Sequence, residues 1–198
     1  MFKFVLWICA IVVLFTIINT GGGSVSLGPG VKAPDEPLQT LIPSAVSFYH
    51  RGSELTPLAD YSLKAKVLSK KKYKSGPGSG VCPVDFALGW GNMSDEEVLE
   101  KIEIRQSGRF FYWSTKDFPI ERQEIIKSCS NVHLIPATDM VESVLNEVKA
   151  GQIIYLDGKL VKVKSPDGWN AVSSLTRTDS GGGACEVLYV ENAFRSGI

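Results

Sequence analysis

The chain has 198 residues, and its 21 Lys and Arg residues balance its 21 Asp and Glu residues. This length allows one globular domain together with a membrane anchor and a linker. Because the formal net charge is zero, the whole molecule exerts no electrostatic pull on nucleic acid, and we do not expect a nucleic-acid partner.

The N-terminus contains an uncharged apolar segment at residues 4–18, preceded by Lys3. As a helix these residues would extend roughly 22 Å, and flanking residues bring the segment closer to the ~30 Å thickness of a bilayer core. The small residues that a signal peptidase requires are poorly represented after it. We therefore expect an N-terminal membrane anchor over residues 1–20, with a cleaved signal peptide as the alternative. No Lys or Arg follows until Lys32, which places the rest of the chain on the extracytoplasmic side, periplasmic or at the cell surface.

Residues 21–43 are rich in Gly, Pro and Ser. These residues break helices and offer little apolar surface, so the segment is expected to be an extended linker. The globular domain is then expected to occupy residues 44–198.

The first part of this domain combines strand and helix signals. Residues 61–68 alternate apolar and polar side chains, as a half-buried strand does, and residues 109–113 are almost all aromatic, which also favours a strand. Ser94 followed by Glu97 has the spacing of a capping box and predicts a short helix. A second helix is expected over residues 119–129, with Cys129 on its buried face.

The last third of the chain predicts a helix followed by strands. Thr138 is expected to cap a helix over residues 139–150. Asp157-Gly158 lies between two apolar runs and predicts a β-hairpin over residues 153–163. Two further strands are expected at residues 171–177 and 185–190.

Together these elements predict a β-rich α+β fold. We expect an antiparallel meander that closes into a small barrel, with two or three short helices, after an N-terminal transmembrane helix. In appearance the pattern resembles an oligonucleotide-binding barrel or an SH3-like barrel. This resemblance concerns the architecture and implies no function.

Four cysteines limit the covalent chemistry of the chain. Cys9 lies within the apolar segment, and Cys129 is interpreted as a small core residue. Cys82 and Cys185 both border Gly-rich loops, and an oxidising compartment favours pairing, so we predict a disulfide between them.

The same cysteine suggests an enzyme as an alternative. Cys82 could act as a nucleophile and His133 as its base, with Asp85 or Asp139 orienting the imidazole. Two histidines and few cysteines do not make up a four-ligand zinc site, so neither a metal nor another cofactor is expected.

Aromatic and polar side chains provide candidates for binding. Trp90 lies between two glycines, as an exposed binding residue can. The other candidate binding residues are Tyr112, Trp113, Arg177 and Asp179.

These observations favour a non-catalytic binding or assembly module of the cell envelope. Such a module would be anchored through residues 4–18 and would contact an envelope protein or a cell-wall polymer. A hydrolase that uses Cys82 is the first alternative. A nucleic-acid-binding barrel that faces the cytosol is the second.

Overall fold

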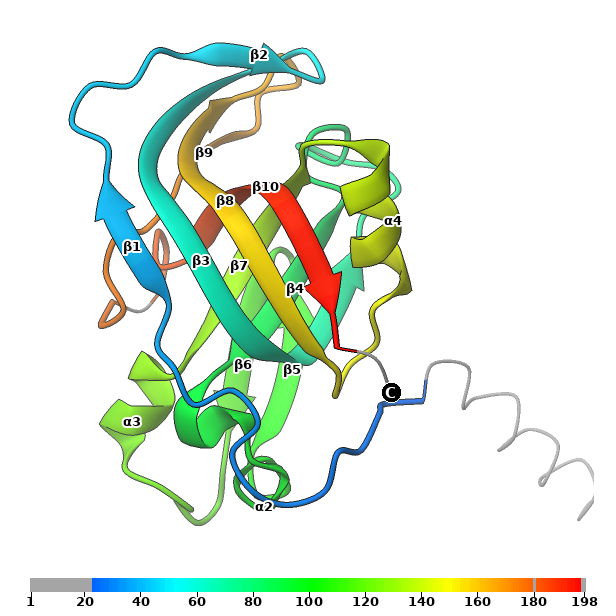
Figure 1. Ribbon diagram of the computed structural model, residues 1–198, viewed down its shortest axis with the longest axis vertical. Helices are drawn as coiled ribbons and strands as arrows, with labels where there is room; N and C mark the ends of the chain where they lie inside the picture. Colours follow the sequence, from blue (N-terminus) through cyan, green and yellow to red (C-terminus); the bar gives the residue numbers. More distant parts are fainter. Residues whose placement is uncertain (1–22, 180, 197–198) are drawn as a thin grey trace, which may run out of the picture.

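The computed structural model describes residues 23–179 and 181–196, and its centre is a closed ring of strands (Figure 1). Around this ring each strand is hydrogen-bonded to the next, in the order β3, β4, β7, β10, β8 and back to β3. Their bounds are Ser53–Lys72 (β3), Val84–Gly89 (β4), Cys129–Pro136 (β7), Ile153–Lys164 (β8) and Glu186–Arg195 (β10). The fold is therefore β-rich α+β, as the sequence predicts.

One neighbouring pair departs from the predicted antiparallel meander. β7 and β10 are parallel, with Val187 opposite His133, whereas the other neighbours in the ring are antiparallel. A parallel pair needs a long connection between its strands. Here that connection contains helix α4, Asp139–Glu147, together with β8.

The remaining elements lie outside the ring. β1 and β2 pair with β3, β9 pairs with β8, and β5 and β6 form a separate hairpin between β4 and β7 in sequence. The strands are β1 (Leu38–Leu41), β2 (Phe48–His50), β5 (Glu103–Ser107), β6 (Phe110–Ser114) and β9 (Asn170–Val172), and the helices are η1 (Gly91–Ser94), α2 (Glu96–Leu99) and α3 (Arg122–Lys127).

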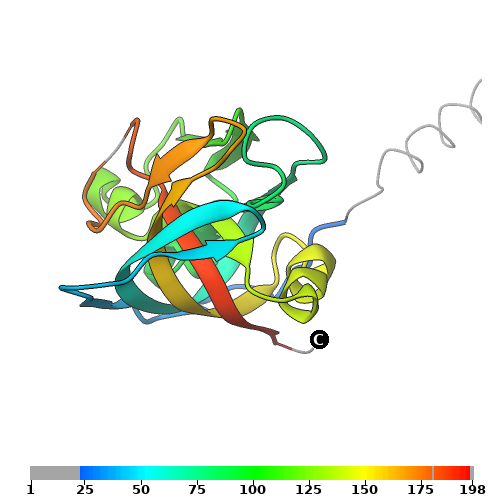
Figure 2. The same cartoon turned by 90° about the horizontal axis from the view of Figure 1, so that it is seen from above.

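The main core fills the ring. Tyr61, Leu63, Ala65 and Val67 on β3 are buried in alternation along the strand, which confirms the predicted strand at residues 61–68. Helix α4 adds Val141 and Leu145 to the same core and stands beside the barrel (Figure 2). The Thr138 side chain accepts a hydrogen bond from the amide of Val141 at 3.2 Å, so the predicted N-cap is confirmed.

The predicted hairpin at Asp157-Gly158 is wrong. Both residues lie inside the continuous strand β8, where Gly158 is opposite Tyr61 on one side and Val190 on the other. A side chain at Gly158 would overlap the carbonyl oxygen of Tyr189. Gly158 is therefore not part of a turn. It allows β10 to approach closely where the pairing of β10 is irregular, between Val190 and Asn192.

Three smaller predictions also need correction. The cap of α2 is Asp95, which accepts from the amide of Glu97 at 3.0 Å, and not Ser94. The helix predicted over residues 119–129 is only α3, and Cys129 begins β7. The strand predicted over residues 171–177 is limited to β9.

The segment predicted as a linker packs against the barrel from residue 23 onward. The amide of Val25 donates to the carbonyl of Ala150 at 2.8 Å, and the amides of Lys32 and Ala33 both donate to Oγ of Ser94 at 3.0 Å. β1 then extends the sheet at β3. Glycine and other small residues leave the backbone amides of this segment accessible. In a tether these amides would be hydrated, whereas here they form hydrogen bonds to the domain.

Glu96 is the centre of this attachment. Its carboxylate accepts from the amides of Leu27 and Gly28 at 2.6 and 2.9 Å, from Ser26 at 2.7 Å, and from Lys66 at 2.7 Å. The hydrogen bond from Leu27, followed by that from Lys66, lowers the pKa of Glu96 to about 2. A carboxylate with this many donors is stabilised in its charged form.

Replacing this carboxylate is expected to loosen the N-terminal segment. Glu96→Gln should lower the free energy of unfolding by about 1–2 kcal/mol, because charge-assisted hydrogen bonds become neutral ones. In the unaltered protein the contribution is complete above the ordinary pKa of 4.5 and is lost as the pH falls towards 2. Urea unfolding between pH 7 and pH 3 measures both effects. The adjacent exposed Glu97 is the matched control, and an equal loss in Glu97→Gln would contradict the assignment.

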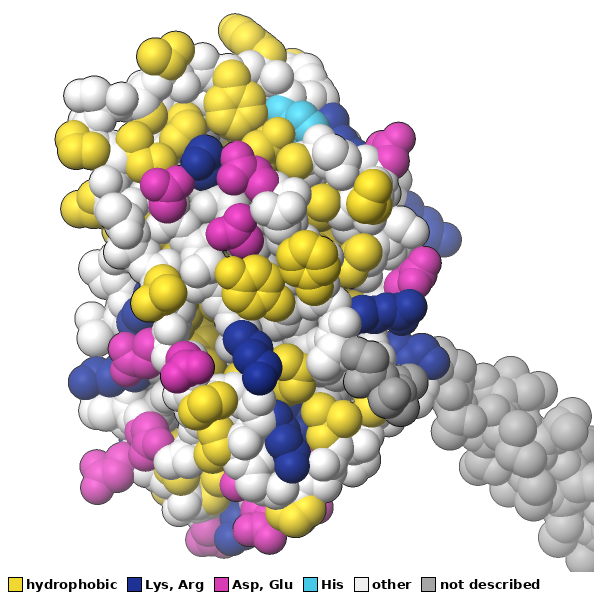
Figure 3. All heavy atoms as spheres, in the orientation of Figure 1, with side chains coloured by type: hydrophobic (Ala, Val, Ile, Leu, Met, Phe, Trp, Pro, Cys, Tyr) yellow, Lys and Arg dark blue, Asp and Glu magenta, His cyan; other side chains and the backbone are white. Residues whose placement is uncertain are grey.

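The predicted membrane anchor, residues 1–20, lies outside the described residues. Among the residues that the structure describes, no helix has the length and apolar character needed to cross a membrane. The face over β3, β8 and β10 mixes charged and apolar side chains, without a large area of one charge (Figure 3). Tyr155 on β8 and Phe194 on β10 lie side by side, with ring centroids 6.3 Å apart.

Candidate active site

A cavity of about 670 Å³ opens between the loop that joins β3 to β4 and the loops on either side of β9. Its lining includes Tyr73, Arg109, His133, Trp169 and Cys185. These residues are far apart in the sequence, and the ring of strands brings them together. Asp85 on β4 is directly opposite His133 on β7, which places the two side chains next to each other.

Asp85 forms the buried base of this site. Its side chain has no exposed surface, and its Oδ1 lies 3.0 Å from Nδ1 of His133 and 3.1 Å from Nη1 of Arg109. The contact to His133 is not well aligned for a hydrogen bond, and Oδ2 of Asp85 has no hydrogen-bond partner among the described residues. A buried, charged carboxylate is stable only beside a compensating positive charge, and the guanidinium of Arg109 supplies that charge.

His133 lies between this carboxylate and a thiol. Burial of the ring lowers its pKa, but Asp85 and Cys185 raise it more, and the pKa of His133 is raised to about 9. At neutral pH the imidazole is therefore positively charged. The edge of the ring also faces Trp169, with centroids 6.1 Å apart.

The two cysteines near His133 differ in accessibility. Cys82 is fully buried, and burial together with Asp85 raises the pKa of its thiol. Its Sγ lies 3.6 Å from Oδ1 of Asp85 and 3.5 Å from Nη1 of Arg109. Cys185 is partly exposed and lines the cavity. A nucleophile must reach its substrate, so Cys185 fits that role and Cys82 does not.

The predicted disulfide is not formed. Cys82, Cys129 and Cys185 are all free thiols in the described part of the chain. Cys82 contacts Asp85 and Arg109, whereas Cys185 accepts a contact from the side-chain amide of Asn131 at 3.6 Å. Each thiol therefore has polar neighbours of its own. The alternative orienting residue, Asp139, begins α4 and is fully exposed, with Arg51 as its ionic partner at 3.8 Å.

Arg109 holds the buried part of the site in place. It follows Gly108 at the tip of the β5–β6 hairpin, and both residues have positive φ, 57° for Gly108 and 66° for Arg109. Its guanidinium lies over the ring of Tyr73 at 4.0 Å and near that of Trp169 at 5.0 Å, and it donates to the carbonyl of Cys82 at 3.1 Å. Positive φ at both positions is the geometry of a two-residue type I′ hairpin turn, so the turn itself accounts for the conformation of Arg109.

Three potential metal ligands meet here. The ligand atoms of Cys82, Asp85 and His133 lie within 4.8 Å of one another. The guanidinium of Arg109 contacts two of these three groups and provides the positive charge that a metal ion would bring. A cation in that position would be repelled by Arg109, so the residues present do not fit a metal site.

A second cavity, of about 260 Å³, adjoins the first. Four predicted binding residues line it, namely Tyr112, Trp113, Arg177 and Asp179, and it shares Phe110 and Cys185 with the larger cavity. The fifth, Trp90, is 1% exposed and belongs to the main core. The glycines around Trp90 therefore allow close packing of the backbone and do not expose the ring.

The two charged candidate residues of the second cavity, Arg177 and Asp179, have separate partners. Arg177 forms an ion pair with the buried carboxylate of Glu186 and donates to the hydroxyl of Tyr61 at 3.1 Å, while Asp179 accepts from Ser174 at 2.6 Å. Burial outweighs the opposing effect of Arg177 and raises the pKa of Glu186 to about 7.

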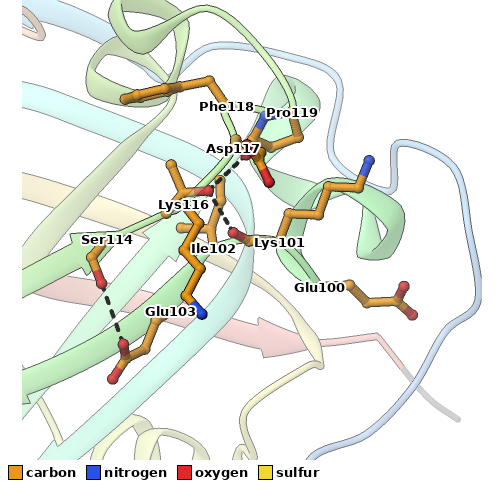
Figure 4. A pocket seen from close by; sticks show the side chains of 10 residues that line it. Glu100, Lys101, Ile102, Glu103, Ser114, Lys116, Asp117, Phe118 and Pro119 are labelled. Carbon is orange, nitrogen blue, oxygen red and sulfur yellow. Dashed lines mark hydrogen bonds between the residues drawn. The ribbon is translucent and has the colours of Figure 1, made fainter.

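A third cavity, of about 710 Å³, lies at the open end of the β5–β6 hairpin, where β5 begins and β6 ends (Figure 4). Its lining is largely charged or polar, and Thr115 at its edge donates to the carbonyls of Lys101 and Asp117. It contains no cysteine or histidine. We therefore do not interpret this cavity as a catalytic site.

Several residues of the site have no local signature in the sequence. Tyr73, Arg109 and Asn131 belong to no short motif, and Trp169 is only one of several aromatic residues. The turn Ser107-Gly108-Arg109 could have drawn attention to Arg109, since it joins two strand-like runs. Cys185 was considered only as a disulfide partner.

Comparison of the chain with protein-family models, with curated proteins and with solved structures finds no match. The interpretation of the site therefore depends on its own geometry and chemistry.

Proposed function

We propose that the domain is a cysteine-dependent enzyme of the acyl-transfer class, with Cys185 as nucleophile, His133 as general base and acid, and Asp85 as the residue that positions His133. The observation that carries this proposal is the row of a buried carboxylate, an imidazole and a partly exposed thiol at the wall of one cavity. This order of groups is the one that activates a nucleophile in triads of this kind.

The chemistry follows from the positions of the protons. In the reactive state the proton of Cys185 resides on His133, so that a thiolate lies beside a positively charged imidazole whose Nδ1 faces Asp85. The thiolate attacks the carbonyl carbon of an ester or amide and forms a carbon–sulfur bond. The tetrahedral intermediate then breaks its bond to the leaving group, which takes the proton from His133. The neutral imidazole then takes a proton from water, which attacks the thioester. The carbon–sulfur bond breaks, the carboxylic acid leaves, and the thiolate and the charged imidazole are restored.

Asn131 is the candidate donor to the developing oxyanion. It is 4% exposed, and its Nδ2 lies 3.6 Å from Sγ of Cys185, while its Oδ1 accepts from Gln106 at 2.8 Å. That hydrogen bond fixes the orientation of the amide. A donor held next to the nucleophile can stabilise the charge that develops on the carbonyl oxygen.

The architecture supports a ligand at this place. The cyclic strand order, with one helix between the third and fourth barrel strands in sequence, resembles that of oligonucleotide-binding barrels more than that of SH3-like barrels. Such barrels bind ligands on their second and third strands and on the loops after the first and fourth. Asp85, His133, Tyr73 and Trp169 occupy the corresponding elements. This argument is one of likeness in topology and carries no specific ligand.

The test of this function is the pH profile of two acetate esters, measured with the full chain in detergent. Ethyl acetate has an alkoxide leaving group that needs a proton from His133, so its kcat/KM should fall as the pH rises through about 9. p-Nitrophenyl acetate has a leaving group that needs no proton and should show no such fall. Iodoacetamide should abolish both activities. The absence of thiol-dependent turnover, or the same fall for both esters, would contradict the proposal.

A non-catalytic binding module of the cell envelope is the second candidate. It is favoured by the aromatic lining of the 260 Å³ cavity, where Tyr112 is 49% exposed. In this case an envelope protein or a cell-wall polymer would occupy the cavity, and the thiol of Cys185 would remain unmodified by substrates.

For either function we propose that residues 4–18 hold the domain at the extracytoplasmic face of a membrane. The support is the apolar segment after Lys3 and the lack of positive charge before Lys32. The full chain should stay with the membrane in alkaline carbonate, and protease added to spheroplasts should digest the domain. Release by carbonate, or protection of the domain from protease, would contradict this placement.

A further inference from the structure

The hairpin strand β6 has one edge without a partner. It pairs only with β5, and no other backbone–backbone hydrogen bond of residues 110–114 is present among the described residues. An unpaired strand edge presents a row of amide and carbonyl groups that can accept another strand.

This edge borders the cavity next to Cys185. Four successive residues, Phe110 to Trp113, line the 260 Å³ cavity. Successive side chains of a strand point to opposite faces, so one face of β6 cannot contribute all four. The edge of the strand, with its backbone groups, must therefore form this wall. The rest of the lining includes Arg177, Asp179, Ala184 and Glu186, together with residues 129–131 at the start of β7.

The 260 Å³ cavity forms a groove along β6, and this groove leads to Cys185, the proposed nucleophile. Phe110, at one end of β6, and Cys185 line both the 260 Å³ and the 670 Å³ cavities. A chain that lay along β6 from Trp113 towards Phe110 would pass Cys185 and continue into the larger cavity. The row of backbone groups suits a ligand that carries its own alternating amides and carbonyls.

We propose that the substrate of this site is an extended polypeptide segment, which binds as an additional strand at the free edge of β6 and presents a backbone carbonyl to Cys185. This inference rests on the proposed cysteine chemistry and specifies its substrate class. Main-chain hydrogen bonds of this kind give affinity with little dependence on sequence, while the flanking pockets select side chains. The bond that breaks is a peptide bond, and its nitrogen takes the proton from His133.

The experiment uses the full chain in detergent and a mixed-sequence hexapeptide library capped at both ends. The library should be cleaved and should slow p-nitrophenyl acetate turnover by competition. The same library with N-methylated backbones lacks the donors for strand pairing, and its inhibition constant should be at least tenfold higher. Chitohexaose serves as the carbohydrate probe and should not compete.

Hydrogen exchange gives a readout that does not depend on catalysis. In Cys185→Ala, the unmodified library should slow exchange of the amides of residues 110–114, and the N-methylated library should not. If ester turnover depends on Cys185 but neither peptide library competes, or if chitohexaose competes instead, the peptide assignment is wrong while the chemistry stands. If ester turnover is absent but the library protects β6, the edge binds peptides without catalysis, which contradicts the substrate role.

Discussion

Replacement of Cys185 by serine is expected to reduce ester turnover by about 10³-fold or more while the fold is retained. The thiol is the group that forms the acyl bond, and a hydroxyl at the same place is a much weaker nucleophile beside an imidazolium. Cys185 is partly exposed, so the change should alter the free energy of unfolding by less than about 1 kcal/mol. Initial rates with p-nitrophenyl acetate, together with urea unfolding, measure both quantities.

The other described cysteines supply the control. Cys129 donates to the carbonyl of Ile125 at 2.9 Å and lines the 260 Å³ cavity, but it does not line the 670 Å³ cavity that contains His133. Cys129→Ser should therefore keep its turnover of p-nitrophenyl acetate, a small ester that does not need the length of β6. Equal turnover in Cys185→Ser and the unaltered protein would eliminate Cys185 as the nucleophile.

Replacement of Asp85 by asparagine is expected to damage both stability and chemistry. The guanidinium of Arg109, which is 14% exposed, would lose the carboxylate 3.1 Å away. Leaving a buried charge without its partner costs about 3–5 kcal/mol. The pKa of His133 should also fall from its raised value, because the carboxylate that raises it is removed while burial remains. Urea unfolding and an NMR titration of the histidine ring measure these effects.

A surface pair gives the matched comparison for this change. Asp60 lies 2.8 Å from Nζ of Lys159, but its side chain is 57% exposed. Asp60→Asn should therefore cost no more than about 1 kcal/mol. Similar losses for Asp60→Asn and Asp85→Asn would show that the buried ion pair with Arg109 does not contribute as described.

Part of the fold can be predicted from the sequence because it depends on local patterns. The alternation over residues 61–68 reflects one buried face of β3, and Thr138 caps α4 through a contact three residues away. The Asp157-Gly158 pattern gave the wrong result because β8 is paired on both sides, and these pairings outweigh the local preference for a turn. The sequence contains no local sign of such long-range pairings.

The N-terminal segment is a second case in which a long-range contact outweighs the local sequence pattern. Its Gly and Pro content suits a tether, but the carboxylate of Glu96, about seventy residues away in sequence, binds its backbone amides. Composition reports on intrinsic flexibility and not on distant partners. The described part of this segment therefore belongs to the domain.

The candidate site was only partly accessible to sequence reasoning. Cys82, Asp85 and His133 were grouped from their chemistry, and the structure brings all three together. The sequence could not distinguish the buried Cys82 from the partly exposed Cys185, because accessibility depends on the closure of the ring. The same holds for Trp90, which is buried although glycines flank it.

The most direct test is to identify the residue that carries the acyl group. The full chain in detergent is mixed with p-nitrophenyl acetate, quenched in acid within milliseconds to seconds, digested without reduction, and analysed by peptide mass mapping. The account predicts an acetyl group, 42 Da, on the peptide that contains Cys185, and none on the peptides with Cys82 or Cys129. An unmodified Cys185 in protein that turns over the ester, or an acetyl group on Cys82, would contradict it.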